Sequence, residues 1–292
     1  MEGLLAQLRE GLHESGFDLL TPFLVSWYNE EEHIVNLPAV HKLPAEAGCL
    51  AVIVGNSRAL WAPFLAWTRT QLEADPTWLE SHPHALDCYT EEKMQQALAR
   101  PDLPASDVIY AAETLETTGR AISVTTAAHV SSLAFYHQTA PPASNTCHLE
   151  RVTLHASTSP CAKTPTMTQT PHQIQRSVHP VLGPWIAYRA VVVFPELRPG
   201  SQQLPRPSPP VDPCSAAEWE KVRELQDECF AKWAPDNPDG SETDWARLVE
   251  VVEVFEAGRE HAYSADQLAF HYSGHDEPGR VEHLRRCATR SE

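Results

Sequence analysis

The chain of 292 residues is long enough for one large domain, and its hydrophobic content of 42% argues against wholesale disorder. Its 22 Lys and Arg residues against 39 Asp and Glu residues give a formal net charge of −17 at pH 7. A field of this sign repels nucleic-acid phosphates and anionic membrane surfaces, so we expect neither as a partner.

The seven cysteines are odd in number, widely spaced and without a C-x-x-C pair, which favours reduced thiols over a disulfide scaffold or zinc ribbon. Residues 1–10 lack the features of a signal peptide, and their acidic side chains argue against a transit peptide. The longest largely apolar stretch, 185–195, is too short for a bilayer, which needs about 20 residues. These observations predict a cytoplasmic location.

The first third of the chain alternates helical and extended patterns. Leucines at helical spacing predict an amphipathic N-terminal helix, with Gly16 as its stop. Pro22 restricts the apolar segment 17–28 to an extended or edge conformation. The β-branched run 49–54 predicts a buried strand, and the apolar stripe 61–72 predicts a helix.

The middle of the chain is less regular. We predict helices at 91–99 and 124–138 and a strand at 107–112. The stretch 140–175 is rich in Thr, Ser and Pro and shows no sustained period, which indicates a long surface insertion.

The last third begins with the strongest predicted strand, 185–194, and a proline-rich connector at 195–213 follows it. Helices predicted at 216–233, at 242–260 and after Ser264 make 214–290 a helical C-terminal part of a single domain, 1–292. Because strands and helices mix without a strict βαβ rhythm, the predicted fold class is α+β.

Two segments carry candidate chemistry. In a helix over 124–138, His129, Ser132 and Tyr136 share one face, and polar side chains cluster at the end. The alternative is a core helix with a hydrogen-bonded histidine. In the strand 185–194, Arg189 stands among apolar residues and needs a partner, because an unpaired buried charge is costly. The partner is either an internal carboxylate or an anionic ligand held by the planar guanidinium.

A third candidate, the histidines and cysteine at His82, His84 and Cys88, is better interpreted as a solvated loop than as a metal corner. We therefore predict no protein-bound metal.

Four segments in order resemble the CblC-type family of cobalamin-processing proteins. They are P-F-L-V-S-W-Y-N-E at 22–30, T-A-A-H-V and its continuation at 126–138, H-P-V-L-G-P-W-I-A-Y-R at 179–189, and Y-S-A-D-Q at 263–267 with Arg280. The resemblance spans roughly residues 17–285. It implies a nitroreductase-like α+β fold, with a mixed or antiparallel sheet flanked by helices.

The resemblance also implies a function. Cobalamin would be bound base-off and would lose its upper axial ligand, a cyano group by reduction with reduced flavin (FMN or FAD) or an alkyl group by transfer to glutathione. Removing the lower axial donor leaves cobalt less electron-rich, so its reduction becomes easier. A downstream cobalamin-trafficking protein is a further implied partner.

Carried over by position, the resemblance assigns residues to ligands without assigning a certain catalytic group. The implied cobalamin contacts are Ile122, Ser123, Val124, Thr125, His129, Tyr136, His137, Gln138, Ser177, Trp185 and Tyr188. His129 is expected to support the corrin site rather than to ligate cobalt. Arg189 and Arg280 match arginines that receive glutathione carboxylates.

The sequence departs from the family pattern at Thr125, where glutamine is usual, at His137, where tyrosine is usual, and at Ser177, which replaces a cysteine. Val181 also replaces an arginine, and Arg247 is only a candidate for a third glutathione arginine. We therefore expect corrinoid binding to be retained and the glutathione chemistry to be weakened. Two alternatives stay open: a cobalamin chaperone without chemistry, and a flavin reductase of the same fold.

Overall fold

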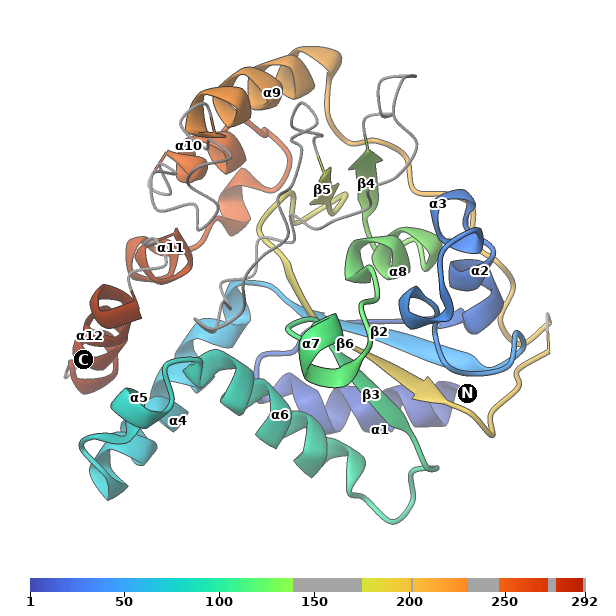
Figure 1. Cartoon of the computed structure of the whole chain (residues 1–292), viewed down its shortest axis with the longest axis horizontal. Coiled ribbons are helices and arrows are strands. Elements are labelled where there is room, and N and C mark those ends of the chain that lie inside the picture. The colour runs from blue at the N-terminus through green and yellow to red at the C-terminus, as the bar shows by residue number, and fades with distance from the viewer. Residues whose placement is uncertain (139–174, 201, 231–246, 273–276, 291–292) are drawn as a thin grey trace.

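The chain forms two antiparallel sheets flanked by helices (Figure 1). The computed structural model describes residues 1–138, 175–200, 202–230, 247–272 and 277–290. The larger sheet has the order β1-β2-β6-β3, and every neighbouring pair is antiparallel. Its strands are β1 (Leu19–Leu24), β2 (Leu50–Asn56), β6 (Ala187–Phe194) and β3 (Asp107–Tyr110). The smaller sheet pairs β4 (Phe135–Gln138) with β5 (Gln175–Val178). The predicted α+β class is confirmed.

Strands β2 and β6 form the centre of the larger sheet because their β-branched residues are covered on both faces. Every residue of β2 is buried, and so is every residue of β6 after Ala187. The edge position predicted from Pro22 is confirmed, since β1 is an outer strand and pairs Pro22 with Val52.

Helices cover both faces of this sheet. Helix α1 (Glu2–His13) buries its four leucines and contacts α6 (Ala85–Leu98), and Figure 1 shows the two below the sheet with α8 (Val124–Val130) above it. Helix α6 begins before the predicted start at residue 91. The other helices of this part are α2 (Val25–Asn29), α3 (Glu32–Val35), α4 (Trp61–Ala74), α5 (Trp78–Ser81) and α7 (Leu115–Thr118).

The helix predicted over 124–138 is wrong in its second half. Helix α8 ends at Val130, Ser132 takes a left-handed conformation with φ 60°, and β4 follows. The aromatic residues of 135–138 favour an extended chain, and pairing with β5 decides the outcome. Consequently His129, Ser132 and Tyr136 do not share one helical face.

The C-terminal part contains α9 (Ala216–Phe230), α10 (Leu248–Glu253), α11 (Ala265–Tyr272) and α12 (Glu277–Thr289). Helix α10 is shorter than the helix predicted at 242–260. The predicted cap of α11 is confirmed, because Ser264 Oγ accepts from the Gln267 N–H at 3.2 Å. Nearly all of the predicted insertion 140–175 lies outside the described residues. The described part of 195–213 contains no helix or strand.

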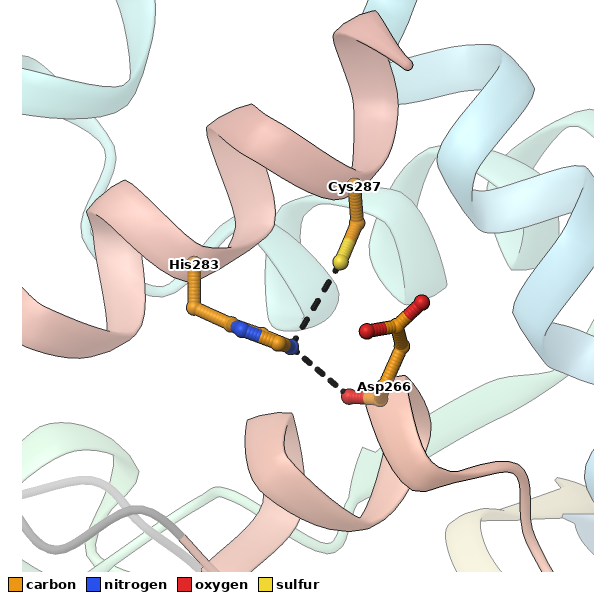
Figure 2. A group of neighbouring side chains, drawn as sticks. All are labelled: Asp266, His283 and Cys287. Carbon is orange, nitrogen blue, oxygen red and sulfur yellow. Dashed lines mark hydrogen bonds between the residues drawn. The ribbon is translucent and has the colours of Figure 1, made fainter. Parts of the chain in front are cut away.

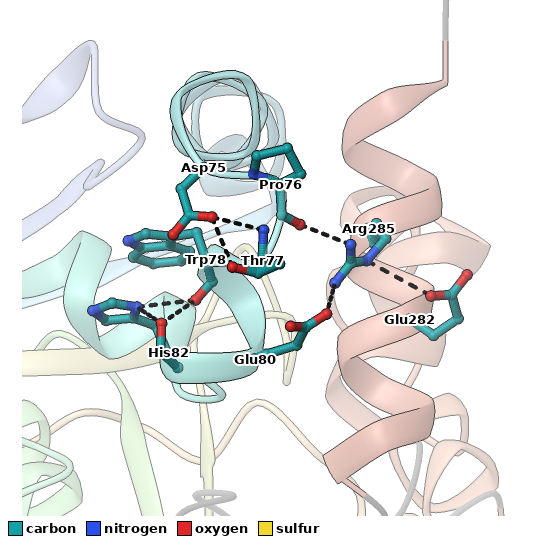
Figure 3. Close-up of polar contacts among 9 residues, drawn as sticks. Asp75, Pro76, Thr77, Trp78, Glu80, His82, Glu282 and Arg285 are labelled. Atoms are coloured by element: carbon teal, nitrogen blue, oxygen red, sulfur yellow. Dashed lines mark hydrogen bonds and ion pairs between the residues drawn. The ribbon is translucent and has the colours of Figure 1, made fainter.

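Arg285 fixes α12 to the N-terminal half of the chain (Figure 3). Its guanidinium donates to the Pro76 carbonyl at 2.9 Å and to a Glu80 carboxylate oxygen at 3.2 Å, and its Nε lies 3.7 Å from Glu282. Figure 3 also shows His82, whose ring stacks on that of Trp78 with centroids 4.2 Å apart. Its Nδ1 lies 2.9 Å from the Trp78 carbonyl oxygen.

The turn at 179–183 is held by its own histidine and by a close backbone approach. His179 Nδ1 accepts from the N–H groups of Val181 and Leu182, both at 3.0 Å. Gly183 has a φ of 61°, and a Cβ there would lie 1.8 Å from the Ala257 carbonyl oxygen. Only glycine fits this position.

We expect Gly183→Ala to lower the free energy of unfolding by about 2–4 kcal/mol, because it adds backbone strain and an overlap with Ala257. Gly48→Ala is the matched control, since a Cβ there meets nothing within 4 Å, and it should change stability by less than about 0.5 kcal/mol. Urea unfolding of both variants makes the measurement, and equal stabilities would contradict the close-approach argument.

Candidate functional site

Most of the implied cobalamin residues meet around the start of α8 and the β4–β5 pair. Ser123 organises the first part: its Oγ accepts from the Thr126 N–H at 3.2 Å and contacts Thr125 Oγ1 at 3.0 Å. Its own N–H donates to the Tyr28 hydroxyl at 2.8 Å. The turn 122–125 is therefore rigidly placed, with Val124 in the core and Ile122 packed against it.

Tyr136 lies against this turn. Its hydroxyl bonds the Thr125 side chain, and burial raises the pKa of the phenol. The Tyr136 N–H donates to His129 Nδ1 at 3.2 Å, so this ring nitrogen carries no proton. Burial also lowers the pKa of His129. A neutral His129 thus holds the backbone of β4 in place by accepting this hydrogen bond.

Ser177 and Tyr188 join β5 to the larger sheet. Their hydroxyl oxygens are 2.6 Å apart, and Ser177 is the strand partner of Tyr136. Burial raises the pKa of the Tyr188 hydroxyl above its usual range. We call Ser123, Thr125, His129, Tyr136, Ser177 and Tyr188 the β4 cluster.

Arg189 follows Tyr188 and occupies a β-bulge. The β2–β6 register pairs Val54 with Ala190 and Gly55 with Tyr188, so Arg189 is the extra residue. A Cβ on Gly55 would lie 2.8 Å from the Ala187 carbonyl oxygen, so the bulge requires the close approach of a glycine. The bulge interrupts the regular alternation of faces along this strand.

The Arg189 guanidinium is buried, with the residue 7% exposed. Its Nε donates to Asn56 Oδ1 at 2.7 Å, and the Asn56 amide is oriented by its bond to the Ser57 carbonyl at 2.8 Å. Its Nη2 is buried and has no hydrogen-bond partner among the described residues. Burial lowers the pKa of Arg189, opposed by the negative potential of Tyr263 and Asp87.

A pocket opens beside this guanidinium between α6, β3 and β6. The residues that line it are Asp87, Thr90, Glu91, Tyr110, Ala111, Ala112, Tyr188 and Arg189. Burial raises the pKa of Asp87, against the opposing effects of Arg189, His84 and Arg280. We call this the Arg189 pocket. Because Tyr188 belongs to both groups, the pocket adjoins the β4 cluster.

Some expected contacts lie elsewhere. The His137 ring stacks on Trp219 of α9 with centroids 4.0 Å apart, because successive residues of β4 face opposite sides. Trp185 is buried against Tyr263 and Val252. Arg280 lies over the Phe270 ring at 4.3 Å, and of Gln138 only the backbone is described.

Comparisons with known proteins identify the family of this chain. The family model of the methylmalonic aciduria and homocystinuria type C family matches residues 16–237. The chain belongs to this family. A Danio rerio protein named cyanocobalamin reductase / alkylcobalamin dealkylase is 29% identical over 235 residues, which cover 77% of each chain. The family resemblance seen in the four sequence segments is confirmed.

The family also has a solved fold that this chain shares. The crystal structure of a Caenorhabditis elegans B12-trafficking protein CblC superposes with a TM-score of 0.68 and 19% sequence identity. The match covers 100% of this chain and 97% of the other. No helix among the described residues has the length and apolar character needed to cross a membrane.

Sequence reasoning missed the residues that surround Arg189. Asn56 of β2 accepts its hydrogen bond, and Asp87 of α6 lines the same pocket. A further residue that was missed is His33, whose Nε2 lies 2.7 Å from Thr126 Oγ1. The sequence indicated only that a buried arginine needs a partner. It did not indicate which residue that partner is.

We expect Asn56→Ala to lower the free energy of unfolding by about 1.5–3 kcal/mol, because it leaves a buried charged donor without its acceptor. Asn36→Ala, at an exposed helix end, is the control and should have little effect. Thermal or urea unfolding tests the pair, and an unchanged Asn56→Ala stability would show that the bond to Arg189 is dispensable.

Proposed function

We propose that this protein binds cobalamin base-off and removes its upper axial ligand during intracellular B12 trafficking. The observation that carries the proposal is the family match over 16–237, because this range contains every cobalamin residue assigned above. The name of the Danio rerio relative supports both halves of the activity, reductive removal of cyanide and removal of an alkyl group.

In this proposal the corrinoid lies against the β4 cluster. The short side chains of Ser123 and Thr125 permit close approach of a bulky ligand to the backbone of the turn. Tyr136 and Ser177 add hydroxyl groups beside it. His129 keeps β4 in place through its bond to the Tyr136 N–H. Loss of the lower axial donor makes the cobalt easier to reduce, which favours departure of the upper ligand.

In this proposal one carboxylate end of glutathione lies at the Arg189 pocket. The buried Nη2 of Arg189 is a charged donor with no hydrogen-bond partner among the described residues, and a glutathione carboxylate supplies the missing acceptor. The thiolate then attacks the alkyl carbon, a carbon–sulfur bond forms, and the cobalt–carbon electron pair remains on cobalt. In this proposal the two reactants are neighbours, because Tyr188 lines the pocket and bonds Ser177 of the β4 cluster.

A flavin phosphate carries more negative charge than a carboxylate, so the same pocket suits it less well. Its described lining contains one cation, Arg189, beside the carboxyl groups of Asp87 and Glu91. We therefore assign no residue to flavin binding. Reduced flavin is treated only as a reductant to be tested in solution. A cytoplasmic location fits this proposal, because glutathione and free flavin are soluble reactants.

An absorbance titration tests the function. Purified apo-protein is titrated with methylcobalamin, and we expect a saturable blue shift of the corrin band, the mark of base-off binding. Added glutathione should then convert the bound methylcobalamin, and a reductant such as reduced flavin should convert bound cyanocobalamin. A shift without conversion would identify a cobalamin chaperone. No shift would refute the proposal.

We expect Arg189→Lys to lower glutathione-dependent dealkylation by at least about 10-fold, because an ammonium cannot replace the planar guanidinium. Decyanation by an external reductant should change much less. Arg223→Lys, on the exposed surface of α9, is the control. Equal losses of both reactions in a folded Arg189→Lys protein would show that Arg189 does not act on glutathione.

Asp87→Asn should act in the opposite direction. Its carboxylate competes with a glutathione carboxylate for Arg189, so its removal should lower the KM for glutathione several-fold. Steady-state kinetics at saturating methylcobalamin make the measurement. A raised KM would mean that Asp87 helps to bind glutathione.

A further inference from the structure

Three side chains at the junction of α11 and α12 bring metal-ligating atoms together. They are Asp266, the second residue of α11, and His283 and Cys287, one turn apart on α12 (Figure 2). One ligand atom from each lies within 4.8 Å of the others. Neither the β4 cluster nor the Arg189 pocket includes any of them, and they lie beyond the family match at 16–237.

The spacing fits a single zinc ion. A tetrahedral zinc with a Zn–N bond of about 2.0–2.1 Å and a Zn–S bond of about 2.3 Å holds its nitrogen and sulfur ligands roughly 3.6 Å apart. His283 Nε2 and Cys287 Sγ are 3.5 Å apart. Residues four apart on one helix share a face, so both side chains point toward Asp266, as Figure 2 shows.

The surroundings also fit a cation. Cys287 is 6% exposed, and its side chain hydrogen-bonds that of Asp266, so the thiol and the carboxylate already face each other. Arg290 Nη1 donates to Asp266 Oδ2 at 3.0 Å, which orients the carboxylate. A mixed nitrogen, sulfur and oxygen set is typical of zinc, whereas calcium and magnesium take oxygen ligands.

We propose that Asp266, His283 and Cys287 bind one Zn²⁺ ion that fastens α11 to α12, with water as its fourth ligand. On binding, the thiol releases its proton to solvent, and the proton of His283 resides on Nδ1. Nε2 then exchanges its present bond to the Asp266 carbonyl, at 2.8 Å, for the metal. Because α12 also carries Arg280, which lies over Phe270 of α11, the ion fixes the position of that arginine.

The test uses the full chain, first freed of metal by a chelator and then titrated with Zn²⁺ by calorimetry. We expect one saturable site and a higher melting temperature with zinc, since a ligand of the folded state stabilises it. Co²⁺ in place of Zn²⁺ should give a thiolate-to-cobalt charge-transfer band. Cys287→Ser should abolish that band and weaken zinc binding by at least about 10-fold.

Cys214→Ser is the control, because Cys214 is a half-buried thiol outside the group, and it should retain the band and the affinity. If Cys287→Ser does not fold, Asp266→Asn decides the question, since Asp266 is half-exposed and asparagine has nearly the same shape. The proposal is overturned if the chain binds no zinc, or if these variants bind it as tightly as the original chain.

Discussion

The structure depends on one buried charge, the guanidinium of Arg189 at a bulge in the central strand β6. Burial of this charge requires an acceptor, and Asn56 of the neighbouring strand supplies it at 2.7 Å. The bulge in turn requires Gly55 opposite it and brings two consecutive residues, Tyr188 and Arg189, to one pocket. A regular strand would have turned them to opposite faces.

The bulge connects the two proposed binding regions, the β4 cluster and the Arg189 pocket. Tyr188 bonds Ser177 of the β4–β5 pair on one side and lines the Arg189 pocket on the other. A corrinoid on the β4 cluster and a thiol donor held by Arg189 would thus meet at Tyr188. In the proposed reaction, the order of residues along a single strand would therefore bring the two reactants side by side.

The regular parts of this fold could be predicted from local sequence, and the irregular parts could not. Strands β2 and β6 follow from their β-branched runs, and Pro22 correctly marked an edge. The helix predicted over 124–138 failed because β4 forms only by pairing with β5, more than thirty residues away. Asp87 escaped prediction for the same reason: its place beside Arg189 is set by the packing of α6 and not by its neighbours in sequence.

A crystal structure of the protein with methylcobalamin tests the account most directly. The account predicts a corrin ring in contact with the turn 122–125, Tyr136 and Ser177, with its lower base away from cobalt and its upper ligand directed toward Tyr188 and the Arg189 pocket. A corrin bound elsewhere, or one that keeps its lower base on cobalt, would contradict the assignment of the site.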